Sequence, residues 1–261
     1  MNIERSPSFV LRFKPGTFPW PEGKRVAVSL SFDDARPSQI DAGLALLARH
    51  RARATFYVMP LAVRKDLDGW KRARDEGHEI GNHSMTHPCS GNFQWSRVRA
   101  LEDLTLERMR ADIAAADEEI RRLLGVSPAT FAYPCGQSFV GRGVERRSYT
   151  PLVAESFLAG RGFREEVHND PGYCDLAHVG AFDFDNTTFE QFLARVRAAE
   201  AERGWLVLAG HEVGLDRPQS VSVETLNAVC DYCAEPANGV WIDTMAAVAA
   251  YVRKTQDLGV P

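Results

Sequence analysis

Short apolar runs alternate along this chain with longer stretches in which apolar residues recur every three or four positions. That alternation is typical of βα units arranged around a mostly parallel sheet or barrel. The clearest run, VAVSLSF, predicts a strand over residues 26–32. Further strands are predicted over residues 54–58, 78–82, 130–133, 163–167, 178–184, 205–210 and 240–242.

Three stretches have the apolar period of an amphipathic helix. The most regular one predicts a helix from Leu106 to Leu123, and Gly125 follows it as a C-terminal stop. A second helix is predicted from about Thr188 to Gly204. A third carries on one face Leu226, Val229, Cys230 and Cys233.

No repeat, low-complexity tract or linker rich in Pro, Gly and Ser divides the sequence. We therefore predict one domain over residues 25–261, after an N-terminal arm over residues 1–24. The expected fold is α/β, a single-domain distorted (β/α) barrel with about seven parallel strands. An open doubly wound sheet is the alternative, but the strand ends carry acidic and histidine residues instead of a glycine-rich phosphate loop. In such barrels the active site lies at the C-terminal ends of the strands.

Composition narrows the range of partners. The 261 residues are 44% hydrophobic and 25% charged, with a formal net charge of −4, so no basic footprint for nucleic acid is present. No apolar run approaches the roughly 20 residues that span a bilayer, and the first residues lack the apolar segment of a secretory signal. We expect neither a nucleic-acid nor a membrane partner, and a cytoplasmic location unless an export signal has been removed.

The five cysteines are an odd number spread through a large chain, which favours reduced thiols over a disulfide framework. The CxxC pair, Cys230 and Cys233, suggests a redox or zinc site. Both residues lie on an apolar helix face and no second CxxC completes a zinc site, so buried packing is the preferred interpretation. Cys135 is expected to be accessible in the cleft, without a nucleophilic role.

Two adjacent carboxylates, Asp33 and Asp34, follow the first predicted strand in the segment SFDDA. Neighbouring side chains point in different directions where the chain leaves a sheet, so one can bind a cation while the other acts as a base. The alternative is that one of them caps the helix that carries Ile40, Leu44 and Leu47.

The segment GHEIGNHSMTHP places His83 and His87 four residues apart. One helical turn or a tight loop brings imidazoles at that spacing to one ion, and Zn²⁺ or a related divalent metal favours nitrogen donors. Asp34 is the candidate third ligand. The alternative is a surface coincidence or a satisfied polar loop. His78 precedes its strand instead of following it, so we expect it to be structural.

Two further elements end predicted strands. In FAYPCG, the turn formed by Tyr133, Pro134, Cys135 and Gly136 is predicted to bind substrate, with a backbone N–H, that of Cys135, as an oxyanion donor. A plain turn is the alternative. In WLVLAGHE, His211 leaves a buried strand and can protonate a leaving group, although a structural role is the alternative for a lone histidine.

The four elements in this order resemble the polysaccharide deacetylases of carbohydrate esterase family four, the nodulation-type deacetylase homologues. The resemblance covers most of the chain from Arg25 to Val252. It implies that Asp33 is the catalytic base and His211 the general acid. It also implies a metal site formed by Asp34, His83 and His87.

Three positions depart from the family pattern. Ala35 replaces the glycine of TFDDG, so the turn after the carboxylates is expected to differ slightly. Ala132 replaces the arginine of RxPxG, which neighbours the catalytic aspartate. Arg36, Arg142 and Arg161 are candidate substitutes. The aspartate that orients the catalytic histidine is not evident, and its candidates are Asp183 and Asp185.

These features predict a metal-dependent hydrolase that removes acetyl groups from an N- or O-acetylated saccharide. Its cofactor is one divalent ion, Zn²⁺ or alternatively Co, Ni, Mn or Fe. A non-sugar amide or imide is the alternative substrate, and a non-catalytic carbohydrate-binding homologue is the alternative from another class. The sequence does not predict the oligomeric state. Three aromatic residues are candidates to stack on a sugar ring: Trp95, Phe139 and Tyr149.

Overall fold

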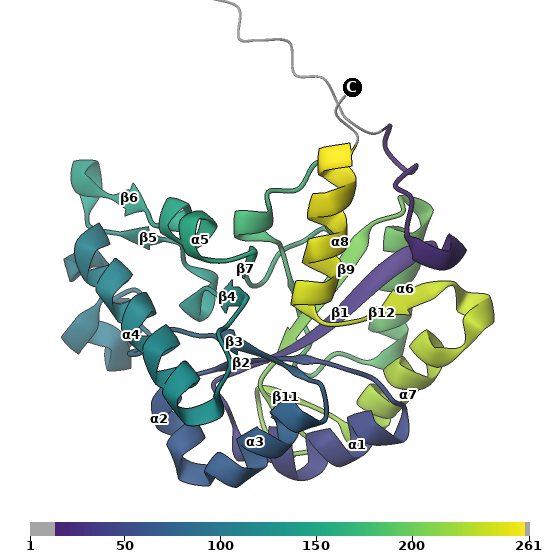
Figure 1. Ribbon diagram of the computed structural model, residues 1–261, viewed down its shortest axis with the longest axis horizontal. Helices are drawn as coiled ribbons and strands as arrows, with labels where there is room; N and C mark the ends of the chain where they lie inside the picture. The colour runs from purple at the N-terminus through teal and green to yellow at the C-terminus, as the bar shows by residue number, and fades with distance from the viewer. Residues whose placement is uncertain (1–13, 259–261) are drawn as a thin grey trace, which may run out of the picture.

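The computed structural model describes residues 14–258 and contains an eight-stranded, all-parallel sheet that curls into a half barrel surrounded by helices (Figure 1). Its strands, in chain order, are β1 Val26–Asp33, β2 Thr55–Val58, β3 Glu79–Asn82, β4 Thr130–Ala132, β7 Ala159–Arg161, β8 Phe182–Asp183, β9 Trp205–Gly210 and β12 Val240–Ile242. Two small pairs lie outside this sheet, namely β5 Phe139–Val140 with β6 Arg147–Ser148, and β10 Glu212–Val213 with β11 Ser220–Val221.

Seven strands follow one another in the order β7-β4-β3-β2-β1-β9-β8. The eighth, β12, pairs with residues 26–28 at the start of β1, whereas β2 pairs with residues 31–33 at its end. The two edges of the path come together, because Val179 pairs with Arg161 of β7 and residues 182–183 pair with β9. The predicted distorted (β/α) barrel is thereby confirmed.

Helices connect the strands and surround the sheet (Figure 1). They are α1 Leu44–Arg49, α2 Pro60–Val63, α3 Leu67–Asp75, α4 Leu106–Leu124, α5 Thr150–Ser156, α6 Phe189–Ala201, α7 Val223–Ala234 and α8 Met245–Leu258. The most regular predicted helix is α4, which ends at Gly125 in the left-handed conformation (φ 69°), as a glycine C-cap should. Among residues 14–258, no helix combines the length and the apolar character needed to cross a bilayer.

One predicted strand is wrong and another is too long. Residues 163–167 form no strand, and the chain pairs with β4 earlier, in β7. The pattern misses β7 because it is short and contains Gly160, where a Cβ would come within 2.4 Å of the Ala177 carbonyl oxygen. The strand predicted over 178–184 is reduced to the two residues of β8.

Every residue of β1 is buried, and its side chains alternate between two cores. Val28 and Phe32 face the helices, in a cluster that also contains Cys230 and Cys233, so the predicted buried packing of the CxxC pair is observed. Ala27 faces the second cluster. The described part of the predicted arm joins that second cluster through Phe18 and Trp20, and residues 1–13 lie outside the described residues.

Candidate active site

A cavity of about 740 Å³ opens at the C-terminal ends of the strands. It lies at the edge of the barrel where the polar residues were expected, because parallel strands all end on the same side. Six of the candidate residues line it: Asp33, Asp34, His83, His87, Cys135 and His211. Four segments far apart in the sequence therefore meet in one place.

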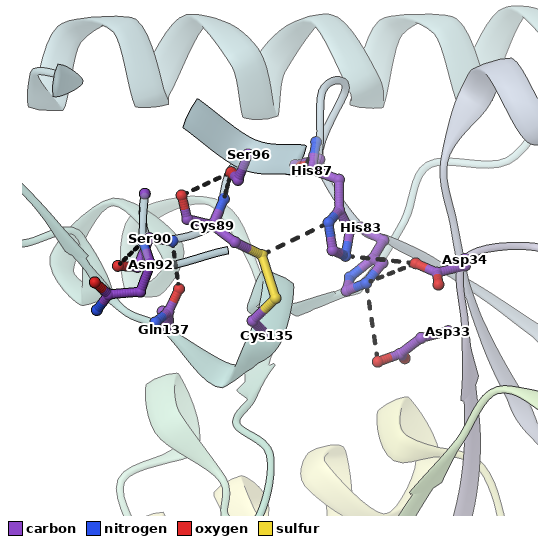
Figure 2. Close-up of a disulfide and its surroundings, with 12 residues drawn as sticks. Asp33, Asp34, His83, His87, Cys89, Ser90, Asn92, Ser96, Cys135 and Gln137 are labelled. Atoms are coloured by element: carbon purple, nitrogen blue, oxygen red, sulfur yellow. Dashed lines mark hydrogen bonds and ion pairs between the residues drawn. A yellow bond between two sulfur atoms is a disulfide. The ribbon is translucent and has the colours of Figure 1, made fainter. Parts of the chain in front are cut away.

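Three of these side chains form a compact donor set. The Nε2 atoms of His83 and His87 lie 3.5 and 3.4 Å from the Asp34 Oδ1 atom (Figure 2). Two ligands at about 2.0–2.2 Å from one tetrahedral ion are about 3.3–3.6 Å apart, so the spacing matches a shared cation. The Ala132 carbonyl oxygen lies 3.0 Å from His83 Nδ1, and accepting that proton leaves Nε2 with a free lone pair.

The protonation states of this set also suit a cation. Burial and the neighbouring His83 lower the pKa of His87 to about 4, so its imidazole is neutral near pH 7. Burial alone would raise the pKa of Asp34, but His83 and His87 outweigh it and lower that pKa to about 2. A carboxylate oxygen and two imidazole nitrogens are a donor set that divalent metals such as Zn²⁺ accept.

Tight turns, and not a helix, carry the three side chains of this donor set. After β1, Asp34 and Ala35 both have left-handed backbone conformations, with φ of 73° and 54°. After β3, Ser84 and His87 do the same, with φ of 65° and 51°. The left-handed region costs an alanine roughly 1–2 kcal/mol, so Ala35 holds this turn at an energetic cost that glycine would avoid.

A buried arginine of β7, Arg161, pairs with Asp33 at the end of β1. Arg161 is fully buried, its Nη2 forms an ion pair with Asp33 Oδ1, and its guanidinium lies 5.0 Å from the Tyr57 ring centroid. In the pairing of β4 with β7, Arg161 is the register partner of Ala132. The guanidinium missing at Ala132 is therefore supplied from one strand further along the sheet.

The two other candidate substitutes are engaged elsewhere. Arg36 contacts Asp34 at 2.8 Å, and Arg142 contacts Asp103 at 2.6 Å. Burial opposes ionisation of Asp33, but the Arg161 charge outweighs it, so the pKa of Asp33 lies below its ordinary value. The carboxylate next to the donor set is therefore ionised and able to accept a proton.

Asp185 holds His211 at two points. Its Oδ2 atom lies 2.6 Å from His211 Nδ1, and its Oδ1 atom accepts a hydrogen bond of 2.9 Å from the His211 backbone N–H. Asp183, the other candidate, lies 3.3 Å from Arg164 instead. Burial lowers the pKa of His211, but Asp185 and the Asp33 charge outweigh it and raise that pKa above its ordinary value.

Gln39 is a site residue that the sequence analysis missed. It is fully buried in a π-helical turn, η2 Gln39–Gly43, and its Nε2 donates to the backbone oxygens of Asp33 (2.6 Å) and His211 (2.7 Å). Its side chain thereby ties the end of β1 to the end of β9. The signal that could have identified Gln39 is its polar side chain next to the apolar helix position Ile40.

Of the four residues in the turn after β4, only Cys135 lines the cavity. Cys135 lines the cavity, but the Tyr133 hydroxyl donates to the Ala177 oxygen at 2.7 Å and the side chain is buried away from it. Pro134 is also buried, and Gly136 packs against Phe163. The Tyr133 ring belongs to the core, and the substrate-binding role of this turn stays a prediction.

Cys89 and Cys135 form a disulfide, with their Cα atoms 6.2 Å apart (Figure 2). The expectation of reduced thiols is wrong for this pair, because the parallel sheet places the turns after β3 and β4 side by side although 46 residues separate them. The remaining cysteines, Cys174, Cys230 and Cys233, are free as expected.

One of the three proposed stacking residues borders the cavity. Trp95 lines it, is 60% exposed, and has its ring centroid 5.9 Å from that of His87. Tyr149 is fully buried, and the Arg146 guanidinium lies over the Phe139 ring. Of these three residues, Trp95 is therefore the one available for stacking on a sugar.

The polysaccharide deacetylase family model matches residues 21–142. A chitooligosaccharide deacetylase of Bradyrhizobium sp. (strain ANU 289) is 41% identical to this chain over 97 residues, which are 37% of this chain and 43% of that protein. The chain spans less than half of the length of the curated relatives that it matches. The resemblance inferred from the motifs is confirmed.

Solved structures share the fold over most of the chain. A putative polysaccharide deacetylase from Mycobacterium smegmatis superposes with a TM-score of 0.65 at 18% identity, covering 93% of this chain and 94% of that one. An allantoinase, PuuE, gives a TM-score of 0.66 at 13% identity, covering 96% and 99%. At these identities the likeness concerns the fold alone.

Proposed function

We propose that this chain is a metal-dependent hydrolase that removes acetyl groups from an N- or O-acetylated saccharide, because its residues 21–142 match the polysaccharide deacetylase family model. The observation that supports this best is the donor set of Asp34, His83 and His87, which shares one cavity with Asp33 and His211. Hydrolysis of an amide or ester needs a polarised carbonyl, a base for water and an acid for the leaving group, and this cavity offers residues for each.

Asp34, His83 and His87 would hold a divalent ion, most suitably Zn²⁺, with Co, Ni, Mn or Fe as alternatives. When bound, such an ion supplies Lewis-acid polarisation of an acetyl carbonyl and of a water molecule. Asp33, kept ionised by Arg161, accepts the proton of the attacking water.

The remaining groups contact the oxyanion, the leaving group and the sugar ring. The Cys135 N–H is the proposed donor to the oxyanion, a contact typically worth about 3 kcal/mol in the transition state. His211 has Nδ1 engaged by Asp185, so Nε2 is the nitrogen that donates a proton to the departing amine or alcohol. Trp95 offers a face to the sugar ring.

Acetate release tests the proposal. We expect release from N-acetylglucosamine oligomers or acetylated xylan, loss of activity after dialysis against a chelator, and recovery on adding Zn²⁺ or Co²⁺. Release of product from an imide or other cyclic amide, but not from acetylated sugars, would favour the alternative substrate. Chelator-insensitive sugar binding without turnover would favour a non-catalytic homologue.

The role of Asp185 predicts a change in pH dependence. In Asp185→Asn the pKa of His211 falls, because the carboxylate that stabilises the imidazolium is gone. A general acid works only while protonated, so activity is lost as pH rises through that lower pKa, about tenfold for each pH unit above it. The kcat profile against pH measures this, and an unmoved alkaline limb would contradict the role.

The role of Arg161 predicts a change in the acid limb of the activity profile against pH. In Arg161→Met the pKa of Asp33 rises, because burial is no longer offset by the guanidinium. A base works only while ionised, so on lowering the pH the variant should lose activity at a higher pH than the wild type does. Adding Ala132→Arg to Arg161→Ala should move the acid limb back, because the two positions are register partners. The same acid limb in wild type and Arg161→Met would rule out this role.

A further inference from the structure

The disulfide lies directly against one ligand of the proposed metal site. Cys89 follows His87 by two residues, and its Sγ atom is 3.7 Å from His87 Nδ1 (Figure 2). The other ring nitrogen of His87, Nε2, faces Asp34 at 3.4 Å. The imidazole thus presents one nitrogen to the carboxylate and the other to the sulfur pair.

His87 Nδ1 and the two cysteine sulfurs are spaced as the ligands of a second metal site would be. The ligand atoms of His87, Cys89 and Cys135 all lie within 4.8 Å of one another. Imidazole and thiolate ligands on one tetrahedral ion lie about 3.3–3.8 Å apart, which agrees with the 3.7 Å between His87 Nδ1 and Cys89 Sγ. Two thiolates and one imidazole form a soft donor set of the kind that selects Zn²⁺ or Co²⁺.

We propose that reducing the Cys89–Cys135 disulfide creates a Cys2His metal site that shares His87 with the hydrolytic site. A thiol reductant gives two electrons to the S–S bond and itself becomes a disulfide, while both cysteine sulfurs become thiols. Their two protons leave when the thiolates bind the ion. Attack falls on Cys135, because Cys135 lines the cavity whereas Cys89 is fully buried.

Hydrogen bonds keep the two sulfurs together after the S–S bond opens. The Cys89 backbone N–H donates to Ser96 Oγ (2.9 Å), and that hydroxyl donates to the Cys89 oxygen (2.8 Å). The Ser90 N–H donates to Gln137 Oε1 at 2.7 Å, which joins the turn after β3 to the turn after β4 (Figure 2). The loops therefore remain adjacent without the covalent link, and side-chain rotation suffices to separate the sulfurs to ligand spacing.

The inference goes beyond deacetylation and is tested with Co²⁺ as the probe. Full-length protein is reduced with a phosphine, which becomes the phosphine oxide with oxygen from water, and is titrated with Co²⁺ without oxygen. We expect a thiolate-to-cobalt charge-transfer band in the near ultraviolet for the reduced protein and no such band for the oxidised protein. Identical spectra in both states would overturn the proposal.

Two variants separate this site from its neighbours. Cys89→Ser/Cys135→Ser keeps Cys174, Cys230 and Cys233, so a band that survives in it would come from those thiols and would also overturn the proposal. His83→Ala removes a ligand of the hydrolytic site only, so the reduced form of this variant should keep the band. If the wild type shows the band but no deacetylase activity, the proposed function fails while the sulfur site stands.

Discussion

His83→Ala should lose both bound metal and hydrolytic activity, the latter by more than about 100-fold. Substitution of a group that merely orients a ligand typically costs 10–100-fold in metal affinity or activity, so loss of a ligand should cost more. His83 is fully buried between Asp34 and the Ala132 oxygen, and alanine removes its imidazole nitrogen from the donor set. Metal content by elemental analysis and acetate release measure the two effects.

His168→Ala is the matched control for that variant. The His168 imidazole pairs with Glu202 at 3.0 Å and does not line the cavity, so metal content and turnover should stay at wild-type values. Metal bound to His83→Ala at wild-type stoichiometry would show that the ligand assignment is wrong. Circular dichroism establishes that both variants are folded.

Asp33→Asn should keep the metal and lose turnover by at least about 100-fold, within the range that a general base contributes. Its amide cannot take a proton from water, whereas the donor set of Asp34, His83 and His87 is untouched. The substitution also leaves Arg161 buried without a charged partner, which lowers the free energy of unfolding by up to about 3–5 kcal/mol. Activity must therefore be measured well below the midpoint of thermal unfolding.

The adjacent substitution, Asp34→Asn, sharpens the comparison. The same chemical change one residue along removes a ligand instead of a base, so metal content should fall in this variant and not in Asp33→Asn. Equal metal loss in both would mean that the two carboxylates share the cation. Equal activity in Asp33→Asn and wild type would exclude Asp33 as the base.

The spacing of the apolar residues and the polar residues at the predicted strand ends were enough to predict the barrel. The strands around β1 have strong apolar runs, and α4 has both a clear period and a glycine stop. The strand β7 was missed because its three residues, AGR, carry no apolar run, and its pairing comes from close contact at Gly160. Short strands that depend on tertiary contacts leave little trace in local sequence.

The donor set was predictable because each member ends a strand, and parallel strands end at one edge. Partners joined across the sheet were harder to find. Arg161 was one of three candidate arginines, and only the register of β4 against β7 singles it out. The Cys89–Cys135 pairing and the bonds of Gln39 depend in the same way on which turns become neighbours.

The closure of the barrel between β7 and β9 depends on few backbone pairs. That seam contains one isolated pair at Val179 and the two residues of β8, and Asp185, which contacts His211, follows β8 by two residues. Asp34 follows β1 directly, and β1 pairs with β2 over three residues and with β9 over six, whereas His83 follows β3, which pairs with β2 over four residues. Because Asp185 lies two residues after the short strand β8 and contacts His211, substitutions at this seam are expected to shift His211 more than Asp34 or His83.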